Sequence, residues 1–213
     1  MLRAVLIVAI AWALYSPLPT IYFKFLRKEN YEPGTLEFTF DDGPNPEFTP
    51  RLLSLLEENG VRATFFVVGQ KAERYPDLVK RERATGHTIG LHCYDHTHPL
   101  FWGPIKTARD MDRAQAALES LGITPIYYRP PHGWVNLTML RKVRSRGMRL
   151  KLWTAIPGDW DEHMSVDQLY EAIAEVARTG GVVCLHDSNH RMDSPSRAPL
   201  TTLEALERYF ETR

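Results

Sequence analysis

The chain has 213 residues, of which 44% are apolar and 24% are charged. This composition is typical of a globular protein long enough to bury one substantial core. Basic and acidic residues balance, but four of the bases lie within residues 1–29, so the remainder is slightly acidic and gives no reason to expect a nucleic-acid partner. The two cysteines, Cys93 and Cys184, are too few for a disulfide framework, and we expect both to be buried free thiols.

An uncharged segment, residues 4–23, comes first and is about as long as a bilayer-spanning helix requires. We interpret it first as an uncleaved membrane anchor. Two alternatives stay open, because its most apolar part, Ala4 to Tyr15, is short enough for a cleaved signal peptide and is also compatible with a buried helix. Cations flank the segment on both sides and leave its topology undecided: Arg3 on one side, and Lys24, Arg27 and Lys28 on the other. We divide the chain into this anchor or signal segment with its basic flank, residues 1–29, and a domain, residues 30–213.

Short apolar strands alternate with longer helices throughout the domain. We predict strands at residues 36–40, 62–68, 88–91, 125–128, 148–154 and 182–185. We predict helices at about residues 50–59, 71–84, 105–121, 137–146 and 166–179, and a closing helix that begins with a capping box at Thr201. This alternation indicates βα units and a parallel sheet. Six strands cannot close an eight-stranded barrel, which leaves an incomplete barrel or an open doubly wound sheet.

The most informative motif ends the first predicted strand, where Asp41 and Asp42 are followed by a Gly43-Pro44 turn. Neighbouring side chains of a strand point to opposite faces, so the two carboxylates should diverge unless the turn redirects one of them. One carboxylate could then bind a metal ion while its neighbour handles a proton.

Four further polar clusters follow along the chain. Residues 92–96 place His92 and His96 four positions apart, so that they could share one ion with an aspartate, although His98 could compete with His96. The other clusters are Arg129-Pro130-Pro131-His132-Gly133, Asp159-Trp160 and Leu185-His186. Several of these polar residues directly follow a predicted strand, as expected for a barrel with its active site at the C-terminal rim: Asp41, His92, Arg129 and His186.

In order and position, these five motifs resemble those of the polysaccharide deacetylases, the carbohydrate esterase family 4 enzymes with a NodB-type domain. The resemblance covers the chain from about Leu36 to the C-terminus. It implies an α/β fold of the distorted (β/α)7 barrel type, here preceded by the N-terminal hydrophobic helix. It also implies hydrolysis of N-acyl, usually N-acetyl, groups on the amino sugars of a cell-envelope polysaccharide or oligosaccharide.

The same resemblance implies a divalent metal held by Asp42, His92 and His96. Zinc suits these ligands best, and cobalt, nickel or manganese could also occupy such a site. The ion would lower the pKa of a bound water toward neutrality and polarise the amide carbonyl.

Two acid–base pairs are implied as well. Asp41 would be the general base, with Arg129 keeping it ionised and oriented. His186 would be the general acid that protonates the departing amine. Asp159 would orient His186 and favour its protonated form.

For the substrate, the resemblance implies that the backbone N–H of His132 stabilises the oxyanion, and that Trp160 and Leu185 wall the pocket for the acyl methyl group. Three positions depart from the family's usual pattern. Cys93 replaces Ser or Thr after the first histidine, His132 replaces an aromatic residue, and Ile156 replaces the first carboxylate of the fourth motif. No metal ligand or proton-transfer group is lost, so we expect activity with an altered fit to the substrate.

Other functions are compatible with part of this pattern. Two imidazoles and one carboxylate also describe a non-haem iron oxygenase, but that chemistry needs neither an arginine-tethered aspartate nor a separate acid. A membrane-tethered glycan-binding module without turnover would not need Asp41 and His186. A deacylase of a lipid-linked amino sugar is a nearer alternative, because residues 4–23 would hold it close to such a substrate. The family's cell-envelope role implies a location at the cell membrane with the domain facing outward.

Overall fold

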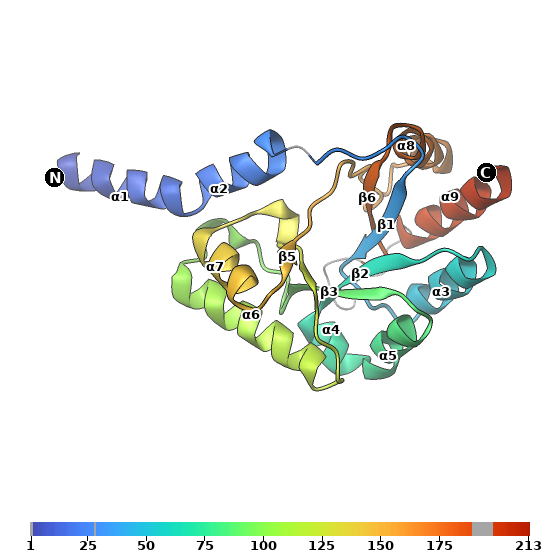
Figure 1. Cartoon of the computed structure of the whole chain (residues 1–213), viewed down its shortest axis with the longest axis horizontal. Helices are drawn as coiled ribbons and strands as arrows, with labels where there is room; N and C mark the ends of the chain where they lie inside the picture. Colours follow the sequence, from blue (N-terminus) through green and yellow to red (C-terminus); the bar gives the residue numbers. More distant parts are fainter. Residues whose placement is uncertain (1, 28, 189–197) are drawn as a thin grey trace.

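The computed structural model describes residues 2–27, 29–188 and 198–213. Its centre is a six-stranded parallel sheet in the order β5-β4-β3-β2-β1-β6 (Figure 1). The strands are β1 (Leu36–Asp41), β2 (Ala63–Val68), β3 (Thr88–Cys93), β4 (Tyr127–Tyr128), β5 (Arg149–Leu150) and β6 (Gly181–His186). Beyond β5 the chain crosses to the other edge of the sheet, where Ala155 forms a parallel bridge with Val183 of β6. The sheet therefore curls into an incomplete, distorted barrel, as predicted, and is not an open doubly wound sheet.

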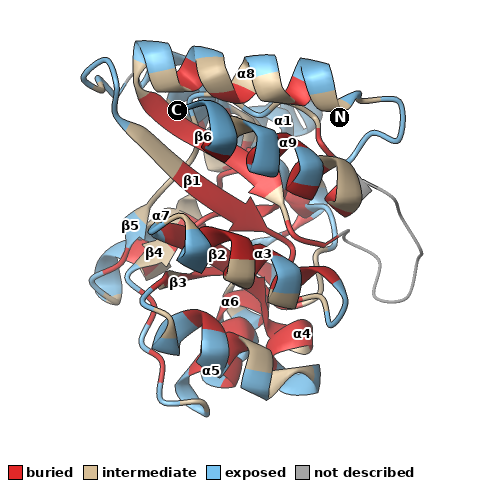
Figure 2. Ribbon diagram, turned by 90° about the vertical axis from the view of Figure 1, so that its right-hand side faces the viewer, coloured by how far each residue is buried: buried red, intermediate tan, exposed pale blue. Residues whose placement is uncertain are grey.

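Helices pack around this sheet. They are α3 (Phe48–Glu58), α4 (Gly69–Arg74), α5 (Pro76–Ala84), α6 (Pro104–Glu119), α7 (Leu137–Ser145), α8 (Val166–Thr179) and α9 (Ala198–Thr212). Figure 2 shows the pattern expected for such layers: the central strands are buried, and the helices expose their outer faces.

Three predicted elements differ from the structure. The helix expected at residues 71–84 is two helices, because Pro76 lacks the N–H that a continuous helix would need and instead begins α5. The strand expected at residues 148–154 pairs as a strand only over Arg149–Leu150, since the chain then leaves β4 for β6. The closing helix begins at Ala198, before the expected cap at Thr201.

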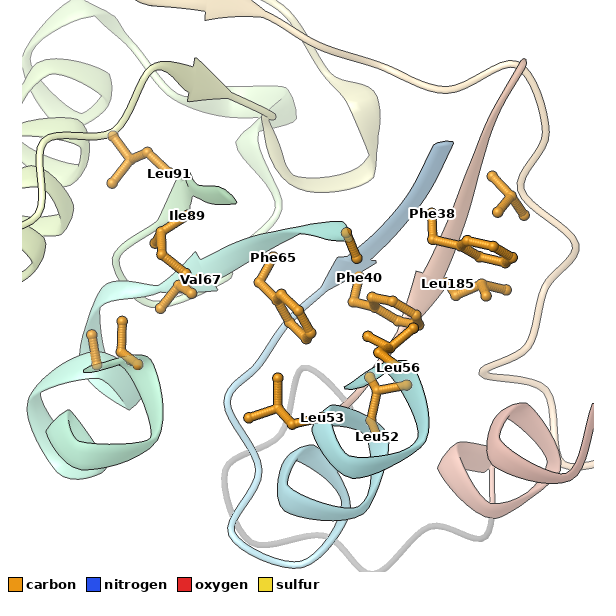
Figure 3. Close-up of a cluster of buried hydrophobic side chains, with 14 of the residues drawn as sticks. Phe38, Phe40, Leu52, Leu53, Leu56, Phe65, Val67, Ile89, Leu91 and Leu185 are labelled. Atoms are coloured by element: carbon orange, nitrogen blue, oxygen red, sulfur yellow. The ribbon is translucent and has the colours of Figure 1, made fainter. Parts of the chain in front are cut away.

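Part of the apolar core lies between β1, β2 and α3. Phe40 and Phe65 stack with their ring centroids 5.2 Å apart. Leu52, Leu53 and Leu56 of α3 cover them (Figure 3). Because side chains alternate along a strand, the residues of β1 that alternate with Phe38 and Phe40 point to the barrel interior. Core packing on one face of β1 therefore fixes Thr39 and Asp41 on the other.

The apolar N-terminal segment forms α1 (Leu2–Tyr15), α2 (Pro17–Ile21) and a π-helical turn, η1 (Tyr22–Leu26). Figure 1 shows α1 projecting from the barrel, and Val5 and Ile7 are 64% and 66% exposed, so α1 is not a buried core helix. An 18-residue window within the stretch Arg3–Leu26 has a mean hydropathy of 1.9, and the stretch is long enough to cross a membrane, but only by length and composition. The division of the chain at residue 29 stays a prediction.

Replacing Leu53 with alanine should lower the free energy of unfolding by about 2–5 kcal/mol, because Leu53 is fully buried and its truncation leaves a cavity. Urea denaturation followed by circular dichroism measures this change. Glu57→Ala, on the exposed face of the same helix, is the control and should change stability by less than about 0.5 kcal/mol. Equal losses in both variants would contradict this account of the core.

Candidate active site

The two adjacent aspartates face the same space because the backbone turns between them. Asp41 ends β1 and points into the barrel, while Asp42 has a left-handed φ of 71° that redirects its carboxylate. Gly43 permits this turn to pack closely: a Cβ there would lie 2.3 Å from a carboxylate oxygen of Asp187. The expected divergence of the two carboxylates is thus cancelled by the turn.

Asp42, His92 and His96 converge on one point. Asp42 Oδ1 lies 3.3 Å from His92 Nε2 and 3.0 Å from His96 Nε2. His92 Nδ1 lies 2.7 Å from the carbonyl oxygen of Arg129, which can only accept, so the ring proton sits on Nδ1. The neutral ring then turns the lone pair of Nε2 toward a carboxylate oxygen. Two acceptors that face each other in this way fit a cation between them.

His98 lies outside this cluster. Its Nδ1 accepts a hydrogen bond from the backbone N–H of Leu100, and its ring stacks on His132 with the centroids 4.5 Å apart. His132 also packs edge-on against His96 at 5.1 Å. The structure therefore places His96 beside Asp42. His98 is separated from His96 by the ring of His132.

Backbone strain concentrates at these loops. Within the described ranges, the non-glycine residues with positive φ are Asp42, His96 and His132, at 71°, 53° and 55°. A non-glycine residue in this conformation costs of order 1–3 kcal/mol, and such residues cluster at functional sites. All three line one cavity, which supports a functional site there.

The charge state of Asp42 follows from its neighbours. Burial alone would raise the pKa of Asp42, but the charge of the neighbouring His96 imidazole holds that pKa well below its usual range. A carboxylate that stays ionised in a buried position can bind a cation at neutral pH.

Arg129 is fully buried and holds Asp41 from below the cavity. Its Nη1 donates to Asp41 Oδ1 at 2.7 Å and to Thr39 Oγ1 at 2.8 Å. Its Nε and Nη2 donate to the carbonyls of Lys151 and Leu152 at 3.0 and 2.8 Å. Such a charged, multiply bonded partner fixes the orientation of Asp41.

Both predicted thiols are free and buried, and one of them touches this pair. Cys184 Sγ donates to Asp41 Oδ2 at 3.4 Å, so the two oxygens of Asp41 have different partners. Burial raises the pKa of Cys93 and of Cys184 well above the usual range, which keeps both as thiols. The contact between Cys184 and Asp41 was not foreseen from the sequence, because they are 143 residues apart.

His186 lies beside Asp41 across the β1–β6 pairing and is held by Asp159. Asp159 Oδ1 accepts from His186 Nδ1 at 2.8 Å, and Oδ2 accepts from the His186 backbone N–H at 2.8 Å and from Thr202 Oγ1 at 3.0 Å. Burial would lower the pKa of His186, but the Asp159 carboxylate raises it to about 9. His186 is therefore protonated at neutral pH, with Nε2 directed away from Asp159.

A cavity of about 290 Å³ brings these groups together. Its walls are Asp41, Asp42, His92, His96, His132, Trp153, Ile156, Trp160 and His186. The sequence did not single out Trp153 or Ile156 as wall residues, although Trp153 lies in the strand expected at residues 148–154 and Ile156 follows that strand. Trp160 is half exposed and packs edge-on against His186 with the ring centroids 5.0 Å apart.

Leu185 does not belong to the cavity wall, contrary to expectation. It is fully buried in the apolar core beside Phe38 and Phe40 (Figure 3). Because side chains alternate along β6, His186 points to the site and Leu185 to the opposite face.

Fold and site together describe a parallel α/β barrel with a metal-type triad and two acid–base pairs at its C-terminal rim. The profile of the polysaccharide deacetylase family matches residues 28–150. A peptidoglycan-N-acetylglucosamine deacetylase of Bacillus cereus is 32% identical over 157 residues, covering 73% of this chain and 73% of the relative. A chitooligosaccharide deacetylase of Azorhizobium caulinodans is 33% identical over 157 residues, covering 72% and 74%.

A solved structure agrees with these sequence relatives. The family 4 carbohydrate esterase from Streptomyces lividans, in complex with acetate, superposes with a TM-score of 0.73 at 32% identity. The match covers 84% of this chain and 87% of that one. The chain belongs to the polysaccharide deacetylase family, as its five motifs predict.

Adding Zn²⁺ to chelator-treated protein should raise its Tm, because an ion that binds only the folded state stabilises it by about 2.7 kcal/mol at a hundredfold excess over its Kd. Differential scanning fluorimetry measures the shift. Asp42→Asn should abolish the response, and His98→Ala should keep it, since His98 lies outside the triad. A response lost in His98→Ala and kept in Asp42→Asn would contradict this site.

Proposed function

We propose that this protein is a metal-dependent deacetylase that hydrolyses N-acetyl groups on amino sugars of a cell-envelope polysaccharide or oligosaccharide. The arrangement that supports this activity best is one cavity faced by the Asp42–His92–His96 triad, the Arg129-paired Asp41 and the Asp159-paired His186. The relatives named for deacetylation of peptidoglycan and of chitooligosaccharides support the substrate class.

Asp42, His92 and His96 would hold the divalent metal. Zinc fits two imidazoles and one carboxylate best, and cobalt, nickel and manganese remain alternatives. When bound, the ion supplies a water of lowered pKa and polarises the amide carbonyl of the substrate.

Asp41 acts as the general base in this proposal. Its carboxylate faces the cavity, and Oδ1 is occupied by Arg129. The interaction with Arg129 limits the rotation of the carboxylate, so Asp41 is positioned to accept the proton of the attacking water.

His186 acts as the general acid. An amide nitrogen is too basic to leave without a proton, and His186 is protonated at neutral pH because Asp159 raises its pKa. Asp159 occupies Nδ1, so Nε2 carries the proton that is given to the departing amine. Asp41 and His186 therefore divide the proton transfers between them.

The remaining cavity residues position the acyl group. The loop of His132 would place its backbone N–H against the developing oxyanion. Trp160, Trp153 and Ile156 provide apolar walls for the methyl group. Ile156 takes the place of a carboxylate in this wall, which gives a more apolar pocket.

We further propose that residues 4–23 hold the enzyme at the cell membrane with the catalytic domain on the outer side. The exposed apolar helix supports attachment, and the peptidoglycan deacetylase of Bacillus cereus supports a substrate outside the membrane.

Replacing Asp41 with asparagine should lower acetate release from N-acetylglucosamine oligomers by roughly 10²–10⁴-fold, because asparagine cannot accept the proton. The measurement is kcat/KM of the zinc-loaded full-length chain. Asp112→Asn, on the exposed face of α6, is the matched control and should keep wild-type activity. Unchanged turnover in Asp41→Asn would contradict the proposed mechanism. A folded wild-type protein without turnover would favour a glycan-binding module.

Replacing Asp159 with asparagine should shift the alkaline limb of the pH profile toward acid. His186 works when protonated, so activity is present below its pKa of about 9 and is lost as the pH rises through it. Without the carboxylate this pKa falls, and we expect the limb to move by about 1–3 pH units. Asp161→Asn, in the nearby exposed turn, should leave the limb in place. An unmoved limb in Asp159→Asn would exclude His186 as the group that sets it.

A further inference from the structure

We propose, on the basis of the deacetylase activity proposed above, that a second cavity beside the active site binds a phosphate group that links the amino sugar of the substrate to a lipid. This cavity has a volume of about 320 Å³ and lies between η1 and the segment that follows β5. Trp153 is a wall of both cavities, so the two spaces adjoin. In this proposal, the sugar lies in the first cavity and its phosphate substituent lies in the second.

Lys24 is the cation that makes the second cavity suitable for an anion. Its Nζ donates to the carbonyl of His132 at 3.2 Å and lies 5.6 Å from the ring centroid of Trp153. Both of these residues also line the active site. The ammonium group is thus held at the boundary between the two cavities.

The charge of Lys24 is not neutralised by a carboxylate. In the described part of the chain, no acidic oxygen lies within 4.0 Å of its Nζ. The other cation of the cavity, Arg27, is paired with Glu29 at 3.1 Å, and Glu29 also accepts from Tyr31 at 2.8 Å. The cavity therefore keeps one net positive charge beside the sugar site. A phosphate, with several strong acceptor oxygens, suits such a position.

The apolar helix is fastened to the barrel at this place. Thr20 Oγ1 donates to the carbonyl of Val135 and accepts from its N–H, each at 2.9 Å. Trp134 Nε1 donates to Ser16 Oγ at 2.6 Å, and Tyr15 donates to Thr138 at 3.1 Å. These bonds join Tyr15, Ser16 and Thr20 to the loop that follows His132 and to the first turn of α7.

The first half of the apolar helix also contacts the barrel. Trp12 stacks on Phe101, with the ring centroids 6.4 Å apart. This contact places apolar residues of the helix beside apolar residues of the barrel surface. Phe101 and Ile105, 82% and 76% exposed, add apolar contacts on the barrel itself.

The apolar surface continues to the edge of the second cavity. Leu18 and Ile21 are 49% and 44% exposed, and Phe25 and Leu26 are each 66% exposed. Phe25 is also a wall of the cavity. The lipid attached to a phosphate near Lys24 would find this surface next to it. A lipid-linked amino sugar therefore fits the combination of a sugar cavity, an unpaired cation and an apolar border.

The test compares three substrates of the zinc-loaded full-length chain: polyprenyl-diphosphate-linked N-acetylglucosamine in phosphatidylcholine vesicles, soluble N-acetylglucosamine 1-phosphate, and tri-N-acetylchitotriose. We expect the highest kcat/KM for the lipid-linked sugar. Lys24→Gln keeps a donor for the His132 carbonyl but loses the charge. It should lower the ratio of kcat/KM for the lipid-linked sugar to that for chitotriose by about 10–100-fold, as expected for a charge-assisted hydrogen bond.

Two further variants serve as controls. Lys24→Arg should restore the ratio, and Lys80→Gln, an exposed cation on α5, should leave it unchanged. Equal losses on all substrates in Lys24→Gln would overturn the phosphate site. A soluble sugar phosphate as good as the lipid-linked sugar would overturn the lipid part of the proposal.

Calorimetric binding of N-acetylglucosamine 1-phosphate separates this proposal from the proposed deacetylation. Binding that Lys24→Gln weakens about tenfold or more supports the phosphate site even if no substrate is hydrolysed. Binding that the variant leaves unchanged overturns it, whatever the activity.

Discussion

The buried ion pair between Arg129 and Asp41 is the interaction on which the interior of the barrel depends. A guanidinium group without solvent exposure costs several kcal/mol unless all its donors are bonded and its charge is paired. Here the partners are Asp41 and Thr39 of β1 and the carbonyls of Lys151 and Leu152 beyond β5. The same side chain therefore joins the segment beyond the edge strand β5 to β1, which lies near the opposite edge of the sheet, and orients the proposed base. Fold and chemistry share this one set of contacts, so a change at Arg129 would affect both.

The site combines this rigid base with strained loops at the ends of the strands. Asp42, His96 and His132 adopt left-handed backbone conformations, which the surrounding packing must maintain. Each of the strained residues has a function in the proposed reaction: two bind the metal, and the third belongs to the oxyanion loop. The strain directs side chains of successive loops into one cavity, which extended strands alone would not achieve.

The N-terminal apolar helix and the candidate active site are physically linked in this protein. Lys24, in the turn that ends the apolar helix, donates to the carbonyl of His132, whose ring faces the metal triad. Thr20 and Ser16 fasten the same helix to the residues that follow His132. The helix is thus a part of the wall beside the active site and also carries exposed apolar side chains. A protein without it would lose the second cavity.

The sequence by itself determined the parallel βα architecture and the set of residues at the barrel rim, because apolar strands of a parallel sheet all end at one edge and their polar successors meet there. Local pattern could not decide which way Leu185 points, where the strand at 148–154 stops pairing, or that Asp42 turns back beside Asp41. The hydrogen bond between Lys24 and the carbonyl of His132, 108 residues away, could not be predicted from local sequence either. These features depend on contacts between distant segments, and only the tertiary structure brings those segments together.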